Sequence, residues 1–362
     1  MYKNWIGYKI KSLILIILLS CFPTSLFPHC YEWAIIGAGP AGITALAVLL
    51  ELKTKQTNIV WIDPEFNLGR MGKYYRNVSG NLPNWRLVTY FDGCPILKEF
   101  PCTLRDSIYT YPSEEFLPLR VIVDPLLEAT RYLQTKVPSI KDFITDLNYS
   151  NDIWILLGNN EPIIAKKVIL ATGSHPKKLD YPLPEIPLDL ALDKDILTNL
   201  ISPNDCIAVF GSMHSAFLVL KYLSELPVKQ VINFYSSPYF YGKPGTAGLE
   251  GITAWWAKNI LEKKPPPNLI RLKNTQENRD RYLQTCTKVI YAIGYERNSL
   301  LINGNSNLHF DSETGIIDRH LYGIGIAFPI FQTFADGKKV DLNGFNTYLE
   351  YAKELIPEWI KQ

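Results

Sequence analysis

The chain has 362 residues, 47% of them hydrophobic and 20% charged, with a formal net charge of +2. It is long enough for two domains, each with a core of its own, and its composition is that of an ordinary folded protein. So small a net charge argues against a protein dedicated to nucleic acid, which would usually show a concentrated basic face.

Residues 1–31 resemble a secretory signal or a membrane anchor. Lysines near the start precede an apolar run over 13–19, the order of a basic region followed by a hydrophobic one. The run is shorter than the about 20 residues that a membrane-spanning helix needs. Leu18-Leu19-Ser20-Cys21 also resembles a bacterial lipobox, whose cysteine is acylated. We expect membrane association or export. The alternative is a cytoplasmic protein, because the twin-arginine pair used to export proteins folded around a cofactor is absent.

The most specific motif of the chain follows this segment. A short apolar strand over 33–36 leads into G-x-G-x-x-G at 37–42, and the apolar residues 43–50 predict a helix. A second strand over 59–62 ends on Asp63, about 20 residues beyond the last glycine. The dinucleotide-binding fingerprint consists of these four features in this order and spacing: a strand, a glycine turn, a helix and an acidic residue.

Each part of this motif has a physical role. Gly37 permits the tight turn, Gly39 lets a pyrophosphate approach the backbone, and Gly42 lets helix and strand pack closely. The helix N-terminus presents unpaired N–H groups to the phosphates, and the acid accepts hydrogen bonds from a ribose. The residues expected to bind a cofactor here are Gly37, Gly39, Pro40, Ala41, Gly42 and Asp63.

Further strands are expected in the middle of the chain. Residues 153–157 and 162–165 predict two short strands joined by a turn at Gly158-Asn159-Asn160. A separate apolar strand over 168–170 ends in Ala171-Thr172-Gly173. The proline-rich stretch 176–187 indicates a crossing into another domain.

The order strand, glycine turn, helix then occurs a second time. An apolar strand over 206–210 leads into Gly211-Ser212-Met213-His214-Ser215-Ala216, and a helix continues through 217–223. A strand over 289–293 ends on Gly294, after which the chain is expected to return to the first domain. An amphipathic segment over 343–359 closes the sequence. Two such units imply two nucleotide-binding domains, the second inserted within the first.

This order resembles that of the flavoproteins with two dinucleotide-binding domains, which include pyridine nucleotide-disulfide oxidoreductases and flavin-containing monooxygenases. The resemblance covers about residues 32–345. It implies FAD at the first fingerprint, with Thr172 and Gly173 beside it and Gly325 near the flavin. It implies NADPH, or NADH, at the second fingerprint. The residues implied there are Gly211, Ser212, His214 and Ser215.

The implied fold class is α/β: a doubly wound, Rossmann-like FAD domain with an inserted, smaller NAD(P)-binding-like domain. The expected divisions are the signal-like or anchor segment 1–31, the first part of the FAD domain 32–176, the inserted domain 177–298, and the C-terminal part of the FAD domain with the final helix 299–362.

Within this group the monooxygenase branch is the closer match. Residues 75–81 are similar to a Y-x-x-V-x-x-N segment of flavin-containing monooxygenases, whose asparagine helps to stabilise an oxygenated intermediate. Asn81 is therefore the candidate catalytic residue, since a fixed amide can donate to a developing negative charge. The alternative is a loop asparagine that stabilises a turn beside Gly80. His175 loosely matches a histidine of the same branch, or supports the domain crossing.

The sequence departs from the family pattern in three places. Met213 takes the place of the second glycine, where a side chain obstructs a pyrophosphate, so binding of NAD(P)H at this turn is in doubt. The strand 232–235 lacks an acid for a ribose, which slightly favours NADPH, with Lys243 as a phosphate partner. Ile326 follows Gly325 where the family has an aspartate. His214 could contact the nicotinamide or a phosphate. The more common alternative is a histidine whose ring hydrogen-bonds to the local backbone.

The six cysteines contain no C-x-x-C and no clustered Cys/His spacing. We therefore expect no metal and no thioredoxin-type dithiol. Cys94 and Cys102 could pair in an oxidising compartment, although separate thiols are the default. The aromatic segment 239–256 could form a lid or substrate wall, but buried packing is the simpler expectation for its tryptophans.

The sequence thus predicts an FAD-dependent oxidoreductase reduced by NAD(P)H. The reduced flavin would pass electrons to oxygen or another acceptor. In one form of this hypothesis the enzyme is a monooxygenase that acts on a small molecule. Two alternatives stay open: a membrane-associated flavin dehydrogenase that reduces a quinone, and a flavin-binding protein without turnover. The sequence leaves the substrate and the oligomeric state undetermined.

Overall fold

The structure, a computed structural model, describes residues 29–242, 248–333, 339–342 and 344–362. The lipobox-like tetrapeptide, nearly all of the signal-like segment and Lys243 therefore lie outside the described residues. Within those residues, none of the helices is both long enough and apolar enough to cross a membrane.

The larger of the two main sheets is built around β1 (Cys30–Ile36). This strand pairs in parallel with β2 (Ile59–Ile62) on one side and β8 (Ile163–Leu170) on the other. The sheet follows the order β15-β6-β7-β8-β1-β2-β5, with β17 also paired to β8 and β16 to β17. Its remaining strands are β5 (Ser139–Ile140), β6 (Asp146–Ser150), β7 (Ile153–Leu157), β15 (Leu301–Ile302), β16 (Ile316–Asp318) and β17 (Leu321–Gly323).

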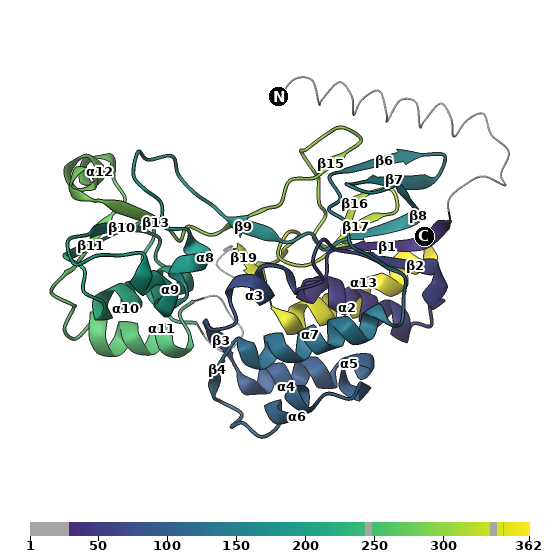
Figure 1. Cartoon of the computed structure of the whole chain (residues 1–362), viewed down its shortest axis with the longest axis horizontal. Helices are drawn as coiled ribbons and strands as arrows, with labels where there is room; N and C mark the ends of the chain where they lie inside the picture. The colour runs from purple at the N-terminus through teal and green to yellow at the C-terminus, as the bar shows by residue number, and fades with distance from the viewer. Residues whose placement is uncertain (1–28, 243–247, 334–338, 343) are drawn as a thin grey trace.

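Helices cover one face of this sheet (Figure 1). Helix α2 (Pro40–Glu51) is buried from Ala41 through Leu49, because its residues are apolar on almost every side. It contacts α7 (Arg120–Gln134) and α13 (Phe345–Lys361), and all three share one core with Trp33 and Ile35 of β1. The shorter helices of this side are α3 (Gly69–Tyr74), α4 (Asn84–Asp92), α5 (Pro95–Glu99) and α6 (Thr103–Ile108).

The second sheet lies at the opposite end of the molecule (Figure 1). All four strands are parallel, in the order β12-β11-β10-β13. They are β10 (Cys206–Phe210), β11 (Gln230–Tyr235), β12 (Leu269–Lys273) and β13 (Lys288–Tyr291). The helices here are α8 (Leu188–Ala191), α9 (Lys194–Asn199), α10 (His214–Glu225), α11 (Gly251–Trp256) and α12 (Gln276–Tyr282).

Two short antiparallel strands join the two ends of the molecule. The outgoing chain forms β9 (Ser174–Pro176), and the returning chain forms β14 (Tyr295–Arg297) beside it. A second antiparallel pair, β3 (Ser79–Pro83) with β4 (Phe116–Pro118), lies next to α11. A third joins β18 (Ile330–Thr333) to β19 (Lys339–Leu342).

The α/β class with two Rossmann-like sheets is confirmed. The expected strands over 59–62, 153–157 and 206–210 have the same bounds in the structure, while the boundaries between domains stay a prediction. One division was wrong, because the two strands expected over 162–165 and 168–170 form the single strand β8.

The lysine pair at positions 166 and 167 caused that error, because it interrupts the apolar pattern of the strand. Lys166 is exposed and pairs with Glu32 at 3.1 Å. Lys167 is buried but satisfied, since its ammonium donates to the backbone carbonyls of Trp359 and Ile360 and lies over the ring of Trp33. A paired buried lysine of this kind is compatible with a continuous strand.

Candidate functional site

The first glycine turn connects β1 to α2. The Gly37 N–H donates to the carbonyl of Ile62 at 2.7 Å, and the residue has a φ of +113°. A Cβ at Gly37 would lie 2.2 Å from the carbonyl oxygen of Ala171, and one at Gly42 would lie 2.0 Å from that of Gly37. The protein's own packing therefore demands glycine at the first and third positions of the motif.

Gly39 differs from these two residues. It has extended backbone, and a Cβ added there would meet no protein atom within 4 Å. Protein packing thus does not explain the glycine at this position, which lies directly before the N-terminus of α2. An open approach to unpaired helix N–H groups is what an adenine-bearing diphosphate requires, so the turn fits FAD.

Asp63 lies where the sequence places it, but its observed partners are backbone groups. The carboxylate is 7% exposed and accepts hydrogen bonds from the N–H groups of Ala38, Glu65 and Phe66 at 2.7, 2.9 and 2.7 Å. Asp63 therefore fixes the shape of the glycine turn. Its predicted contact with a ribose stays a prediction.

The end of β8 is held by the returning chain. Asn298 donates from its side-chain amide to the carbonyl of Thr172 at 2.8 Å, and from its backbone N–H to the carbonyl of Gly173 at 3.2 Å. His175 Nδ1 lies 2.9 Å from Asn298 Oδ1, and its Nε2 lies 3.1 Å from Glu296 Oε1. His175 thus supports the crossing. Asn298 could not be found from the sequence, because its partners lie about 125 residues away.

Gly325 lies against the start of α2, and its place near the flavin stays a prediction. Its φ is +90°, and a Cβ there would come within 2.5 Å of the Ala41 side chain. Ile326, which replaces the family's aspartate, is an exposed apolar side chain. The structure therefore supplies no carboxylate at that position.

The second glycine turn connects β10 to α10. Gly211 has a φ of +128°, and a Cβ there would lie 2.1 Å from the carbonyl oxygen of Ala292. Asn233, fully buried in β11, donates to the carbonyl of Gly211 at 2.8 Å and accepts from Arg271 Nε at 2.9 Å. Ser212 donates from its hydroxyl to the carbonyl of Ser237 at 2.7 Å.

Met213 and His214 complete this turn. Met213 precedes α10 in extended conformation, with its side chain where the fingerprint has none. His214 Nδ1 lies 3.0 Å from the hydroxyl of Thr253 in α11. Burial lowers the pKa of His214 to about 4, although a hydrogen bond with the backbone of Ser79 opposes this shift. A neutral His214 therefore links α10 to α11 and to β3 of the first domain.

Ser215 takes part in a polar network between the two ends of the molecule. It hydrogen-bonds to the hydroxyl of Tyr295, whose pKa is raised by burial first and by Tyr75 second. The hydroxyls of Tyr295 and Tyr75 are 3.2 Å apart, and Tyr75 in turn donates to Asp189 of α8. Asp189 also pairs with Arg70. The sequence could not reveal this network, because Tyr75 and Asp189 are 114 residues apart.

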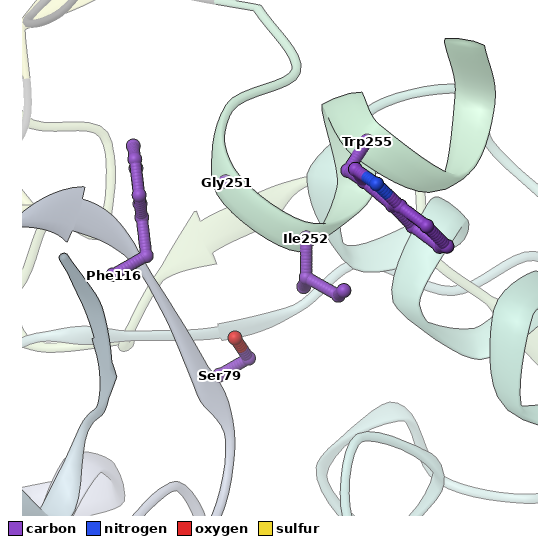
Figure 2. A pocket seen from close by; sticks show the side chains of 5 residues that line it. All are labelled: Ser79, Phe116, Gly251, Ile252 and Trp255. Atoms are coloured by element: carbon purple, nitrogen blue, oxygen red, sulfur yellow. The ribbon is translucent and has the colours of Figure 1, made fainter. Parts of the chain in front are cut away.

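The candidate catalytic residue Asn81 lies on β3 with its side chain exposed, and it makes no side-chain hydrogen bond within the described part of the chain. Ser79 of the same strand lines an open pocket of about 470 Å³ with Phe116, Ile252 and Trp255 (Figure 2). This arrangement leaves Asn81 available to a ligand, but its predicted role is not tested by the geometry.

Of the two adjacent tryptophans, only Trp256 is buried as expected. Trp255 is 54% exposed, so the expectation of buried packing was wrong for it. The cause is the helical geometry, since neighbouring residues on a helix point in different directions and only one of them can face the core.

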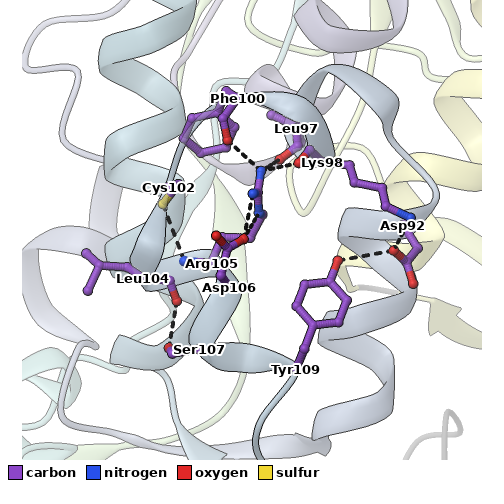
Figure 3. Close-up of polar contacts among 10 residues, drawn as sticks. All are labelled: Asp92, Leu97, Lys98, Phe100, Cys102, Leu104, Arg105, Asp106, Ser107 and Tyr109. Carbon is purple, nitrogen blue, oxygen red and sulfur yellow. Dashed lines mark hydrogen bonds and ion pairs between the residues drawn. The ribbon is translucent and has the colours of Figure 1, made fainter.

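Cys94 and Cys102 do not pair. Both are buried, Cys94 donates to Glu51 Oε1 at 3.3 Å, and Cys102 accepts from the N–H of Arg105 at 3.3 Å (Figure 3). The Arg105 guanidinium holds the loop between them, donating to the carbonyl of Phe100 at 2.6 Å and to Asp106. Each thiol therefore has its own polar partner.

Comparisons with known proteins agree with this geometry. Residues 34–175 match the family model of an FAD-NAD(P)-binding domain. The chain is 25% identical to Monooxygenase AgnR1 of Paecilomyces divaricatus, over 90% of this chain and 97% of that protein.

Solved structures share the fold. The FAD-bound cadaverine monooxygenase DfoA of Erwinia amylovora matches with a TM-score of 0.61 and 14% identity, over 92% of this chain and 95% of that one. The bacillithiol disulfide reductase Bdr of Staphylococcus aureus matches with a TM-score of 0.59 and 11% identity, over 92% and 99%. The chain therefore has the fold of flavoproteins with two dinucleotide-binding domains, and residues 34–175 form an FAD-NAD(P)-binding domain, in agreement with the resemblance seen in the sequence.

Proposed function

We propose that this protein is an FAD-dependent oxidoreductase, reduced by NADPH and acting as a monooxygenase on a small molecule. The observation that carries the proposal is the turn at Gly39, which is open to a diphosphate while its neighbours Gly37 and Gly42 are closed by the protein itself. The match of residues 34–175 to an FAD-NAD(P)-binding domain supports the same assignment. The similarity to Monooxygenase AgnR1 supports oxygenation.

The bound flavin would supply the redox chemistry. The chain itself would hold the diphosphate at Gly39 and the N-terminus of α2, with Asp63 keeping the turn in shape. Asn81 would donate an amide hydrogen bond to negative charge that develops on oxygen. Asn81 is exposed and makes no side-chain hydrogen bond within the described residues, so the bound flavin and substrate would have to orient it and shelter it from water.

The direct test mixes purified protein with NADPH, and separately with NADH, in the absence of oxygen while the flavin absorbance is recorded. Bleaching supports an oxidoreductase, and faster bleaching with NADPH supports the assigned nucleotide. Oxygen is then admitted together with candidate substrates. An oxygenated product supports a monooxygenase, whereas rapid transfer to a soluble quinone instead supports the dehydrogenase.

Asn81→Ala separates the two halves of this cycle. We expect unchanged reduction by NADPH but a fall of about tenfold or more in product formed per NADPH, with peroxide released instead. Asn307→Ala, at another exposed asparagine, is the control. Equal loss of reduction and of product would contradict the role of Asn81 as a donor to oxygen.

A second candidate is a flavin-binding protein without turnover, and Met213 is the observation that favours it. If a bound flavin stays oxidised with both nucleotides, this candidate replaces the first. The location of the protein is a separate proposal, resting on the apolar N-terminal run: we propose membrane association or export. Fractionation of cells that express the full chain tests it, and recovery of unprocessed protein in the soluble cytoplasmic fraction contradicts it.

A further inference from the structure

Two cysteines of the second sheet lie together. Cys206 is the first residue of β10, and Cys286 lies two residues before β13, its parallel neighbour. Their Sγ atoms are hydrogen-bonded at 3.7 Å, although 80 residues separate them in the sequence. The side chains are 6% and 7% exposed.

The backbones on either side hold this pair in place. Thr287, next to Cys286, donates from its N–H to the carbonyl of Cys206 at 2.7 Å. The N–H of Cys206 in turn donates to the hydroxyl of Thr287 at 3.2 Å. The approach of the two sulfur atoms is therefore fixed by strand pairing, and a disulfide of about 2.0 Å requires them to move closer together.

The surroundings favour a thiolate on one of the two sulfurs. A thiolate at Cys206 would accept the S–H of Cys286, and this hydrogen bond lowers the pKa of Cys206 against the effect of burial. The hydroxyl of Thr285 and the positive charge of Lys229 act in the same direction. A thiolate is the form of cysteine that reacts with oxidants.

From this geometry we propose that Cys206 and Cys286 form a site of reversible oxidation, at which hydrogen peroxide produces a disulfide across the start of the second sheet. The Cys206 thiolate attacks one oxygen of the peroxide, the O–O bond breaks, and hydroxide leaves with the electron pair, giving a sulfenic acid. The hydroxide takes up the proton that Cys206 released on ionising and becomes the first water. The sulfur of Cys286 then attacks that of Cys206, the S–O bond breaks, and water leaves with the Cys286 proton. In total, two thiols lose two electrons and one peroxide becomes two waters.

The cysteine pair lies apart from the second glycine turn. Cys206 begins β10 and the glycine turn lies beyond the other end, and five strand residues at about 3.3 Å each separate them by roughly 16 Å. The disulfide would close a loop containing β10, β11 and β12 with their helices. Cross-linking a long loop stabilises the fold chiefly by restricting the unfolded chain.

The test exposes the full chain, first reduced and freed of reductant, to hydrogen peroxide and then maps disulfides by mass spectrometry without reduction. We expect a peptide pair linked through Cys206 and Cys286, loss of two of the six thiols on titration in denaturant, and recovery of all six with dithiothreitol. The thermal midpoint of the oxidised protein should exceed that of the reduced protein.

Two variants sharpen the assignment. In Cys286→Ser, the oxidised protein should carry a sulfenic acid at Cys206, trapped by dimedone, and should show no rise in thermal midpoint. Cys94→Ser, at a buried cysteine whose thiol donates to Glu51, should behave as wild type. Unmodified Cys206 and Cys286 after peroxide, or cross-links mapped elsewhere, would overturn the proposal. Because the wild-type mapping needs no variant and no flavin, its result stands whether or not the proposed oxidoreductase activity is found.

Discussion

The two glycine turns are built on the same plan. In the first, Gly37 donates to the strand that follows in the sheet, and the Trp61 indole donates to the Gly37 carbonyl at 3.0 Å. In the second, Gly211 donates to the corresponding strand, and the Asn233 amide donates to the Gly211 carbonyl at 2.8 Å. Trp61 and Asn233 occupy the same register, each paired with the residue two before the first glycine.

The turns differ at the position that a diphosphate would approach. Gly39 in the first turn is open, whereas Met213 in the second carries a long side chain. The protein's own packing dictates the first glycine in both turns, so that position says little about ligands. The second position is not dictated by packing, and it therefore distinguishes a turn that fits a dinucleotide closely from one that does not.

Replacing the first glycine should have the largest effect. Gly37→Ala and Gly211→Ala each place a Cβ about 2 Å from a backbone carbonyl at a positive φ, so we expect a loss of about 4 kcal/mol or more in unfolding free energy, or failure to fold. Gly304→Ala is the control, since its φ is +77° but its Cβ would meet nothing, and it should cost about 1 kcal/mol. Denaturant unfolding measures all three, and equal losses would contradict the steric argument.

His214 predicts a pH dependence that belongs to the second turn alone. Its pKa is lowered by burial from 6.5 to about 4, so the unfolded chain binds this proton more readily than the folded one. The contribution of neutral His214 to the free energy of unfolding is therefore complete above pH 6.5. It is lost as the pH falls towards 4, by up to about 3 kcal/mol. Unfolding of His214→Asn, followed from pH 7.5 to 4, should lack this part of the slope. A slope equal to that of wild type would show that His214 is not held neutral.

Met213→Gly tests the difference between the turns directly. Glycine is tolerated before a helix, so stability should change little. Removing the side chain should lower the KM for NADPH by about tenfold, or allow flavin reduction where wild type shows none. Met213→Leu keeps the bulk and should behave as wild type. An unchanged KM for NADPH in the glycine variant would mean that the nucleotide does not bind against this turn.

The sequence predicted what local patterns determine. The apolar runs predicted the observed bounds of β2 and β10, and the first fingerprint predicted the turn between β1 and α2. The sequence-based prediction divided β8 in two, because the sequence could not show that Lys167 donates to carbonyl groups at the far end of the chain.

The polar details of the site were beyond prediction for the same reason. Asp189 contacts Tyr75 across 114 residues, and the Cys206–Cys286 pair joins two strands 80 residues apart. Neither contact leaves a spacing that a single sequence reveals. From the sequence, His214 is either a ligand contact or a histidine that hydrogen-bonds to its local backbone. In the structure its partner Thr253 comes from another helix.

Gly39→Ala is the measurement that tests the central claim most directly. A Cβ at this position has open space in the protein, so the variant should fold with the thermal midpoint of the wild-type apoprotein. The affinity of the variant for FAD, measured by titrating the variant apoprotein, should be lower than that of wild type by about tenfold or more, equivalent to about 1.4 kcal/mol. Wild-type affinity in the variant, or a wild-type protein that takes up no FAD, would contradict the account.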